Sequence, residues 1–267
     1  MAAPVSPLEP DTQNWQSQLI GHNFLFRGFD LTALNAALNL DQLSPQRFFS
    51  NRTIFTAFQV NHPLKVLYIA LSGGPITVRS APLDRVITIT YPGSCFGMRN
   101  LPLAHGSITR MFPSVVEAYK TTTVLGIPIE GIHSLYHSHE VFQQRYDMLF
   151  ELREKFQYHL LNCSSYPPQA VASILEALVY QEGSLGNQPG SDGFYTFDLS
   201  VDLIARASQL NQRTVEQVLK GLRQAKVIQT SQDAELGEDE IRVIDPDQLS
   251  EVYSSTRSKV DWWPLKT

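Results

Sequence analysis

The chain has few cysteines, no long apolar runs and fewer basic than acidic residues. Its two cysteines, Cys95 and Cys163, are too few for a disulfide framework, and they cannot by themselves ligate an iron–sulfur cluster. No apolar run approaches the ~20 residues of a transmembrane helix. The first residues, MAAPVSPLEPDTQ, lack the charged and apolar regions of a signal peptide. We therefore expect a cytoplasmic protein that makes no membrane contact.

Motifs typical of catalysis are also missing. The sequence contains no G-x-S-x-G motif, no P-loop and no G-x-G-x-x-G motif. His133, His137 and His139 form the only local histidine cluster, and no Glu stands between His133 and His137 in an H-E-x-x-H arrangement. We interpret these histidines as polar residues at the start of a helix, and we expect neither an enzyme nor a metal site.

Apolar material, in contrast, is sufficient for two domains. The chain contains 267 residues, of which 43% are hydrophobic, and its formal net charge is −5. This length and this apolar fraction allow two separate cores. Residues 1–20 are rich in Pro, Ser and Gln, and we expect them to be flexible.

The most informative stretch is 198–228, whose apolar residues have the spacing of two short helices joined by a tight turn. These residues are Leu203, Ile204 and Ala207 in the first helix, and Val215, Val218, Leu219 and Leu222 in the second. The spacing predicts a helix-turn-helix, although a plain amphipathic hairpin in a core would show the same pattern. Strand-like runs at 194–199, 226–230 and 240–245 favour a winged helix.

The second helix of this motif carries polar residues that suit DNA. Amide and guanidinium side chains match base edges in the major groove. The candidate DNA-binding residues are Gln212, Arg213, Thr214, Glu216, Gln217 and Lys220. Double-stranded DNA is therefore the predicted partner.

The N-terminal half has a different pattern. Short β-branched and aromatic runs at 66–70, 76–78, 86–91 and 121–127 are separated by Gly, Pro, Ser and Asp. Many short strands with turn signals predict a sandwich or a barrel-like roll.

Residues 139–162 contain no Gly or Pro and predict a long helix between the two halves. A stripe of residues at alternating spacings of three and four is typical of a helix that pairs with another helix. The stripe comprises Phe142, Tyr146, Leu149, Arg153, Phe156 and Leu160. The same stripe can instead cover the β domain of its own chain, so both interpretations stay open.

In order and spacing, these features resemble the cyclic-AMP receptor and fumarate-nitrate regulator family, CRP/FNR. The similarity covers roughly residues 24–253 and includes LY-x-x-L-S-G from Leu67, PG-x-x-FG from Pro92, and Arg213-Thr214-Val215. The resemblance implies an α+β fold with an N-terminal double-stranded β-helix (jelly-roll, cupin-like) effector domain, a long dimerisation helix and a C-terminal winged helix-turn-helix.

On this basis we expect five segments along the chain. They are a flexible N-terminus (1–20), a β-roll effector-type domain (21–136), a dimerisation helix (137–165), a winged helix-turn-helix domain (166–253) and a C-terminal tail (254–267). The resemblance further implies a homodimeric bacterial transcription regulator that binds a pseudo-palindromic DNA site. RNA polymerase or another regulatory protein would be a further partner.

The effector pocket departs from the nucleotide-binding members of this family. Those members carry a Glu after the FG turn and an Arg-Ser pair that holds the cyclic phosphate, whereas this chain has Met98 and then Phe112 and Pro113 at these positions. Cyclic AMP bound in the usual way is therefore not expected. Two guanidinium groups close by suit a small anionic effector, and we assign no other cofactor. The candidate pocket residues are Gly97, Met98, Arg99 and Arg110. In the alternative interpretation, Arg99 and Arg110 are solvated loop charges and the pocket binds nothing.

The DNA-reading helix also differs from the family pattern. Nucleotide-responsive members carry Arg-Glu-Thr and an Arg three residues after the Thr, and this chain keeps only Thr214. From Tyr195 to Ser250 there are six basic and ten acidic residues, a net charge of −4, and the wing 233–240 reads DAELGEDE. Because phosphate contacts supply most non-specific affinity, this charge disfavours DNA binding. A regulator that has lost DNA binding and acts through protein partners is therefore the alternative.

The C-terminal tail contains Trp262 and Trp263 beside Pro264. An aromatic patch of this kind can anchor on a partner protein. It can equally fold back on its own domain, and the sequence does not separate the two interpretations.

Overall fold

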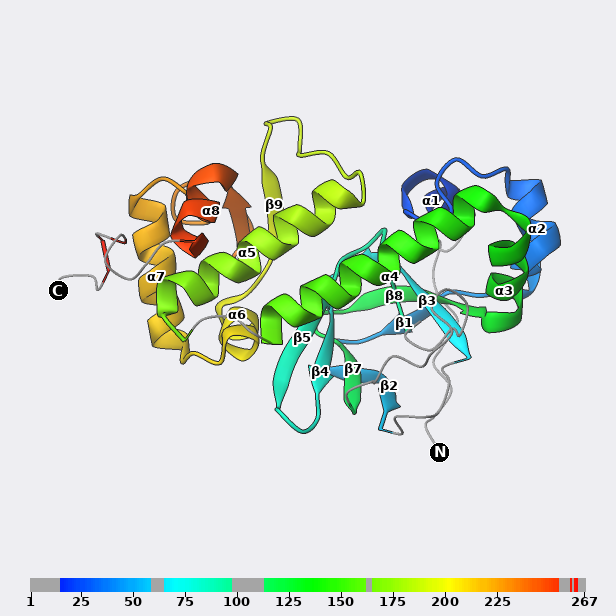
Figure 1. Cartoon of the computed structure of the whole chain (residues 1–267), viewed down its shortest axis with the longest axis horizontal. Helices are drawn as coiled ribbons and strands as arrows, with labels where there is room; N and C mark the ends of the chain where they lie inside the picture. Colours follow the sequence, from blue (N-terminus) through cyan, green and yellow to red (C-terminus); the bar gives the residue numbers. More distant parts are fainter. Residues whose placement is uncertain are drawn as a thin grey trace. The chain divides into compact units, whose positions relative to one another are not determined.

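The computed structural model describes residues 15–58, 65–97, 113–161, 165–254, 260 and 262–263 (Figure 1). The chain divides into two compact units. The first comprises Met1–Ile76 and Thr90–Met148, and the second comprises Thr77–Ile89 and Leu149–Thr267. Helices and antiparallel sheets both occur in the described residues, as the predicted α+β class requires.

Short helices open the first unit. They are α1 (Trp15–His22), α2 (Leu31–Leu38) and a 3-10 helix at Leu40–Gln42. The prediction of a flexible segment over 1–20 is wrong in its last part, because α1 starts at Trp15 and buries Leu19 completely. Residues 1–14 lie outside the described part of the chain.

Strands β1 to β8 build the roll. They are β1 (Gln46–Phe48), β2 (Arg52–Ala57), β3 (Val66–Gly73), β4 (Ile76–Ser80), β5 (Arg85–Thr90), β6 (Cys95–Phe96), β7 (Ser114–Ala118) and β8 (Thr122–Pro128). They form two sheets, with the orders β1-β8-β3-β6 and β2-β7-β4-β5. In the first sheet β3 pairs antiparallel with β8, so that Leu67 lies opposite Ile127 and Ile69 opposite Leu125. The prediction of many short strands in a roll is thus confirmed.

Two helices follow the roll. Helix α3 (Ile129–Ser138) ends at His139, whose extended backbone separates it from α4 (Glu140–Leu161). Helix α4 contains no Gly or Pro, so no residue interrupts its ladder of backbone hydrogen bonds. The long helix predicted over 139–162 is confirmed.

The second unit contains the helix-turn-helix and its wing. Its elements are α5 (Pro167–Ser184), β9 (Tyr195–Asp198), α6 (Val201–Ser208), α7 (Gln212–Gln224), β10 (Ile228–Thr230), β11 (Glu240–Val243) and α8 (Pro246–Ser254). The strands pair antiparallel in the order β10-β11-β9. Helix α5 contacts α6, α7 and α8, as Figure 1 shows. The sequence did not predict α8, which buries Leu249 and Val252.

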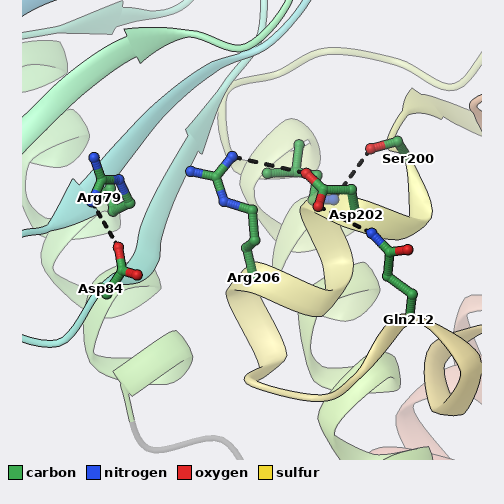
Figure 2. A network of polar contacts seen from close by, with 7 residues as sticks. Arg79, Asp84, Ser200, Asp202, Arg206 and Gln212 are labelled. Carbon is green, nitrogen blue, oxygen red and sulfur yellow. Dashed lines mark hydrogen bonds and ion pairs between the residues drawn. The ribbon is translucent and has the colours of Figure 1, made fainter. Parts of the chain in front are cut away.

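Most of the hairpin of β4 and β5, Thr77–Ile89, belongs to the second unit. Arg79 and Asp84 close this hairpin through an ion pair of 2.7 Å between Nη1 and Oδ1 (Figure 2). The Arg85 side chain is buried, and its Nε donates a hydrogen bond to the carbonyl oxygen of Ala207 at 2.9 Å. A cation at the C-terminal end of α6 is favourable because unpaired carbonyl oxygens gather there.

Candidate DNA interface and effector site

The turn between α6 and α7 is set by local capping. Ser200 Oγ accepts a hydrogen bond from Leu203 N at 3.2 Å, and Asn211 Oδ1 accepts one from Thr214 N at 2.9 Å. Gln209 has a φ of +58°, in the left-handed region, which ends α6. Two side-chain caps and one left-handed residue therefore position the start of α7.

Helix α7 has one buried face and one polar face. Val215, Val218 and Leu222 are fully buried, and burial of each such side chain contributes about 1.5–3 kcal/mol. The six predicted DNA-binding residues lie outside this apolar stripe. Gln212, Arg213, Glu216 and Lys220 are exposed, and Thr214 and Gln217 are half-buried. The structure therefore brings all six together on one helix, away from its core stripe.

Asp202 connects α6 with the start of α7. Gln212 Nε2 donates a hydrogen bond to Asp202 Oδ1 at 3.2 Å, and Arg206 Nη1 lies 3.8 Å from Asp202 Oδ2 (Figure 2). Sequence reasoning missed this interaction, because Gln212 and Asp202 lie on different helices and no periodic pattern relates them. The sequence signals this hydrogen bond only by placing a polar residue in the first turn of each helix.

Half of the basic residues from 195 to 250 are engaged in ion pairs. Arg206 faces Asp202, Arg223 Nε lies 3.4 Å from an oxygen of Asp233, and Arg242 Nη2 lies 3.2 Å from an oxygen of Asp192. The other three, Arg213, Lys220 and Lys226, make no ion pair with any described residue. These three cations are therefore the ones left for an anionic partner.

The acidic wing 233–240 connects β10 to β11. Asp233 pairs with Arg223, and Glu240 Oε2 accepts a hydrogen bond from Gly237 N at 2.8 Å. The carboxylates exposed to solvent include Glu235 and Glu238. Part of the negative charge thus holds the shape of the wing, and part of it faces outward.

One of the four candidate effector residues lies in the described part of the chain. Gly97 follows β6 and has a φ of +91°, a conformation that favours glycine. A Cβ at this position would lie 2.8 Å from Cδ2 of Tyr68 and 3.0 Å from the carbonyl oxygen of Val66, so no side chain fits there. Met98, Arg99 and Arg110 lie outside the described residues, and the anion clamp stays a prediction.

Three aromatic rings cluster beside Gly97. Phe55 comes from β2, whereas Tyr68 and Phe96 come from β3 and β6 of the other sheet. The Tyr68 ring lies 5.2 Å from each of the other two rings, with an angle of 14° between planes. Such offset stacking is favourable for aromatic pairs, and burial raises the pKa of the Tyr68 hydroxyl. Side chains from the two sheets thus meet beside Gly97, a contact that no sequence pattern indicates.

The predicted dimer stripe of α4 is packed inside the chain. Phe142, Tyr146, Leu149, Phe156 and Leu160 are at most 4% exposed, and Arg153 is half-buried. The ring of Phe142 contacts the rings of Phe26, Phe29 and Tyr146. This burial within the chain favours the second of the two interpretations left open by the sequence, and the dimer contact at these residues stays a prediction. The stripe covers its own chain.

A different face of α4 is exposed. Its residues are Val141, Gln144, Met148, Glu151 and Lys155, again at alternating spacings of three and four. Val141 is 52% exposed and Met148 39%. Glu151 and Lys155 form an ion pair of 2.8 Å one turn apart. This face, rather than the buried stripe, is the part of α4 that a second helix could cover.

The described part of the tail packs on its own domain. A Cβ at Gly221 of α7 would overlap the ring of Trp262, so glycine is what allows the ring to lie against the helix. Val260 is buried, and Trp263 N donates to its carbonyl oxygen at 3.1 Å. These contacts favour the interpretation that the tail folds back, and both tryptophans remain half-buried.

The histidine cluster is divided between two environments. The rings of His133 and His137 lie 4.5 Å apart on α3, and His139 packs against Phe29. The described residues contain no group of three or more potential metal ligands. In that same part of the chain, no helix is both long enough and apolar enough to cross a membrane.

Comparisons with known proteins identify the architecture. No protein-family model and no curated protein matches the chain. Among solved structures, FixK2 from Bradyrhizobium japonicum aligns with a TM-score of 0.57 and 13% identity, over 80% of this chain and 98% of that chain. A mutant of CooA from Carboxydothermus hydrogenoformans aligns with a TM-score of 0.55 and 15% identity, over 81% and 90%.

A transcriptional regulator of the CRP/FNR family from Thermus thermophilus aligns with a TM-score of 0.46 and 15% identity, over 79% of this chain and 99% of that chain. At identities this low, the two alignments with TM-scores above 0.5 show the fold alone and leave ligand and target open. The chain therefore has the α+β fold of FixK2 and CooA, which is the fold that its resemblance to CRP/FNR predicts.

Proposed function

We propose that the protein is a divergent member of the CRP/FNR family, a dimeric transcription regulator that acts in the cytoplasm and binds double-stranded DNA through α7. The observation that carries this proposal is the polar face of α7, on which Arg213 and Lys220 make no ion pair with described residues. In helix-turn-helix proteins the second helix lies in the major groove, with its first residues at base edges. Gln212 and Arg213 would read bases, and Lys220 would contact phosphate.

Two copies would pair along the exposed face of α4. Val141 and Met148 are seven residues apart and supply apolar contacts, and Glu151 and Lys155 supply charges beside them. A two-fold dimer binds two half-sites about one DNA turn apart, roughly 34–36 Å, so a pseudo-palindromic site is expected.

The β-roll would serve as a platform or as a sensor of a small anion. Met98 in place of the Glu, and Phe112 and Pro113 in place of the Arg-Ser pair, disfavour a cyclic nucleotide held in the usual way. Arg99 and Arg110 would supply the clamp for a small anionic effector. Such an effector must bind one dimer arrangement better than another in order to change DNA binding.

DNA binding is tested with the full-length protein, a pool of genomic fragments and a salt series. We expect enrichment of a two-fold symmetric site whose affinity falls steeply with salt, since each phosphate contact releases counterions. Arg213→Ala should weaken this binding, whereas the control Arg52→Ala, which removes another exposed guanidinium from β2, should not. Unchanged binding by Arg213→Ala would exclude α7 as the reading helix.

Dimerisation through α4 is tested by sedimentation. Met148→Glu places a charge on the proposed apolar contact and should shift the protein toward monomer. Phe49→Glu is the matched control, because Phe49 is an apolar side chain with 54% exposure that lies just after β1. A Met148→Glu protein that sediments as the unaltered protein does would refute this interface.

A second function is favoured by one specific observation, the outward-facing carboxylates of the wing. Glu235 and Glu238 would repel phosphate and could instead meet a basic surface on RNA polymerase or another regulatory protein. Under this alternative the protein binds no DNA even at low salt. It is instead retained by purified RNA polymerase, and the double variant Glu235→Gln, Glu238→Gln loses that retention.

A further inference from the structure

A side-chain interaction crosses the turn of the helix-turn-helix. Gln212 Nε2 donates to Asp202 Oδ1 at 3.2 Å, and Figure 2 shows the amide and the carboxylate pointing toward one another. Gln212 is the first residue of α7, and Asp202 lies in the first turn of α6. The hydrogen bond therefore lies at the end of α7 that meets base edges when such a helix binds DNA.

The chemistry of this pair determines which way the amide of Gln212 faces. A carboxylate only accepts hydrogen bonds, so it pairs with the NH₂ group of the amide and not with its oxygen. The other oxygen of Asp202 lies 3.8 Å from Arg206 Nη1, so the carboxylate is itself held by a neighbour on α6. Gln212 Oε1 therefore points away from Asp202, and one amide proton remains for another acceptor.

We propose that Asp202 is a positioning residue that orients Gln212 to read adenine, an inference that rests on the proposed binding of DNA by α7. An amide that presents one acceptor and one donor side by side matches the N6 donor and the N7 acceptor of adenine in the major groove. Guanine presents two acceptors, O6 and N7, and thymine presents O4 and a methyl group. Neither of these bases pairs with both atoms of an amide held in this orientation.

The same carboxylate has an electrostatic cost. The Asp202 side chain is 45% exposed, so its charge repels nearby phosphates, and Arg206 offsets part of that charge. Asp202→Asn should therefore change two quantities in opposite directions. Affinity for DNA of any sequence should rise because a negative charge is removed. The preference for adenine should fall because an Asn amide can donate to Oε1 of Gln212 or accept from its Nε2. The Gln212 amide is then no longer held in one orientation.

The experiment is selection from a randomised DNA pool by the full-length protein, followed by titration of the selected site and its single-base variants. The unaltered protein should enrich adenine at one position of each half-site, and Gln212→Ala should lose this enrichment. Asp202→Asn should lower the preference for adenine over guanine at that position roughly tenfold and leave other positions unchanged. Asp247→Asn, which removes an exposed carboxylate from the first turn of α8, is the matched control and should keep the preference.

A conservative variant separates the orienting role from a role in folding. Asp202→Glu keeps a carboxylate acceptor, so it should retain most of the adenine preference, and thermal melting of each variant reports folding. An Asp202→Asn protein that keeps the preference, while Gln212→Ala loses it, would overturn the role of Asp202 and leave DNA binding by α7 intact. Failure of the unaltered protein to bind any DNA would overturn the proposed function and this inference with it.

Discussion

Truncation of Phe142 on α4 should destabilise the fold without weakening the proposed dimer. Its side chain is fully buried, and its ring centroid lies 5.6 Å from that of Phe26, 6.1 Å from Tyr146 and 6.5 Å from Phe29. Phe142→Ala removes buried apolar surface and leaves a cavity among these rings. Such a change costs about 3–5 kcal/mol of the free energy of unfolding. Met148→Ala on the exposed face of the same helix should stay within about 0.5 kcal/mol.

The measurement is a urea titration followed by circular dichroism, with hydrogen exchange to assign the decrease in protection to the first unit. Because m-values in urea are about 1–3 kcal/mol per molar, Phe142→Ala should lower the unfolding midpoint of that unit by about 1 M or more. Sedimentation of the folded variant should show the same association as the unaltered protein. An unchanged midpoint together with dissociation of the proposed dimer would refute the burial argument and favour the stripe through Phe142 as the interface.

Three other predictions follow from the second unit. If Lys220 contacts a phosphate as proposed, Lys220→Ala should reduce the slope of log K for DNA binding against log salt by about 0.9, whereas the exposed control Lys65→Ala should not change it. Burial raises the pKa of Glu182 above its ordinary value near 4.5, so the folded state binds the proton of this carboxyl group more tightly than the unfolded state does. The stability of the fold should therefore decrease as pH rises from about 4.5 through the raised pKa. Glu182→Gln should remove that dependence in urea titrations at several pH values, and a persisting slope would assign it to another group. Gly221→Leu should displace the ring of Trp262 and increase acrylamide quenching of tryptophan fluorescence, and unchanged quenching would contradict the packing of the tail.

Sequence patterns predicted local elements reliably where a single residue type determines the element. The absence of Gly and Pro from 139 to 162 predicted α4, and the apolar spacing of α6 and α7 predicted the helix-turn-helix. The caps Ser200 and Asn211 act within three residues of themselves, which is why a sequence can specify them. Helices α1 and α8 were missed because each is short and depends for its stability on a few buried residues such as Leu19 and Leu249.

The spacing of apolar residues, in contrast, does not show which surface packs against each apolar face. A repeat of three and four residues makes a stripe on a helix, and the same stripe can face another copy or the chain itself. The structure packs the stripe through Phe142 inside the chain and leaves Val141 and Met148 exposed. In the same way, the six DNA-reading candidates were identifiable by residue type, but the hydrogen bond between Gln212 and Asp202 was not.

The sequence by itself determined the strand-rich N-terminal half, the long helix α4, the helix-turn-helix and the polar composition of α7. These follow from interactions within a few residues, namely helix periodicity, strand alternation and capping. Tertiary structure alone decided which face of α4 is covered, that rings from two sheets meet beside Gly97, and which cations of the winged helix are paired. The physical reason is that burial and ion pairing depend on groups distant in the chain, whose meeting is set by packing and not by sequence spacing.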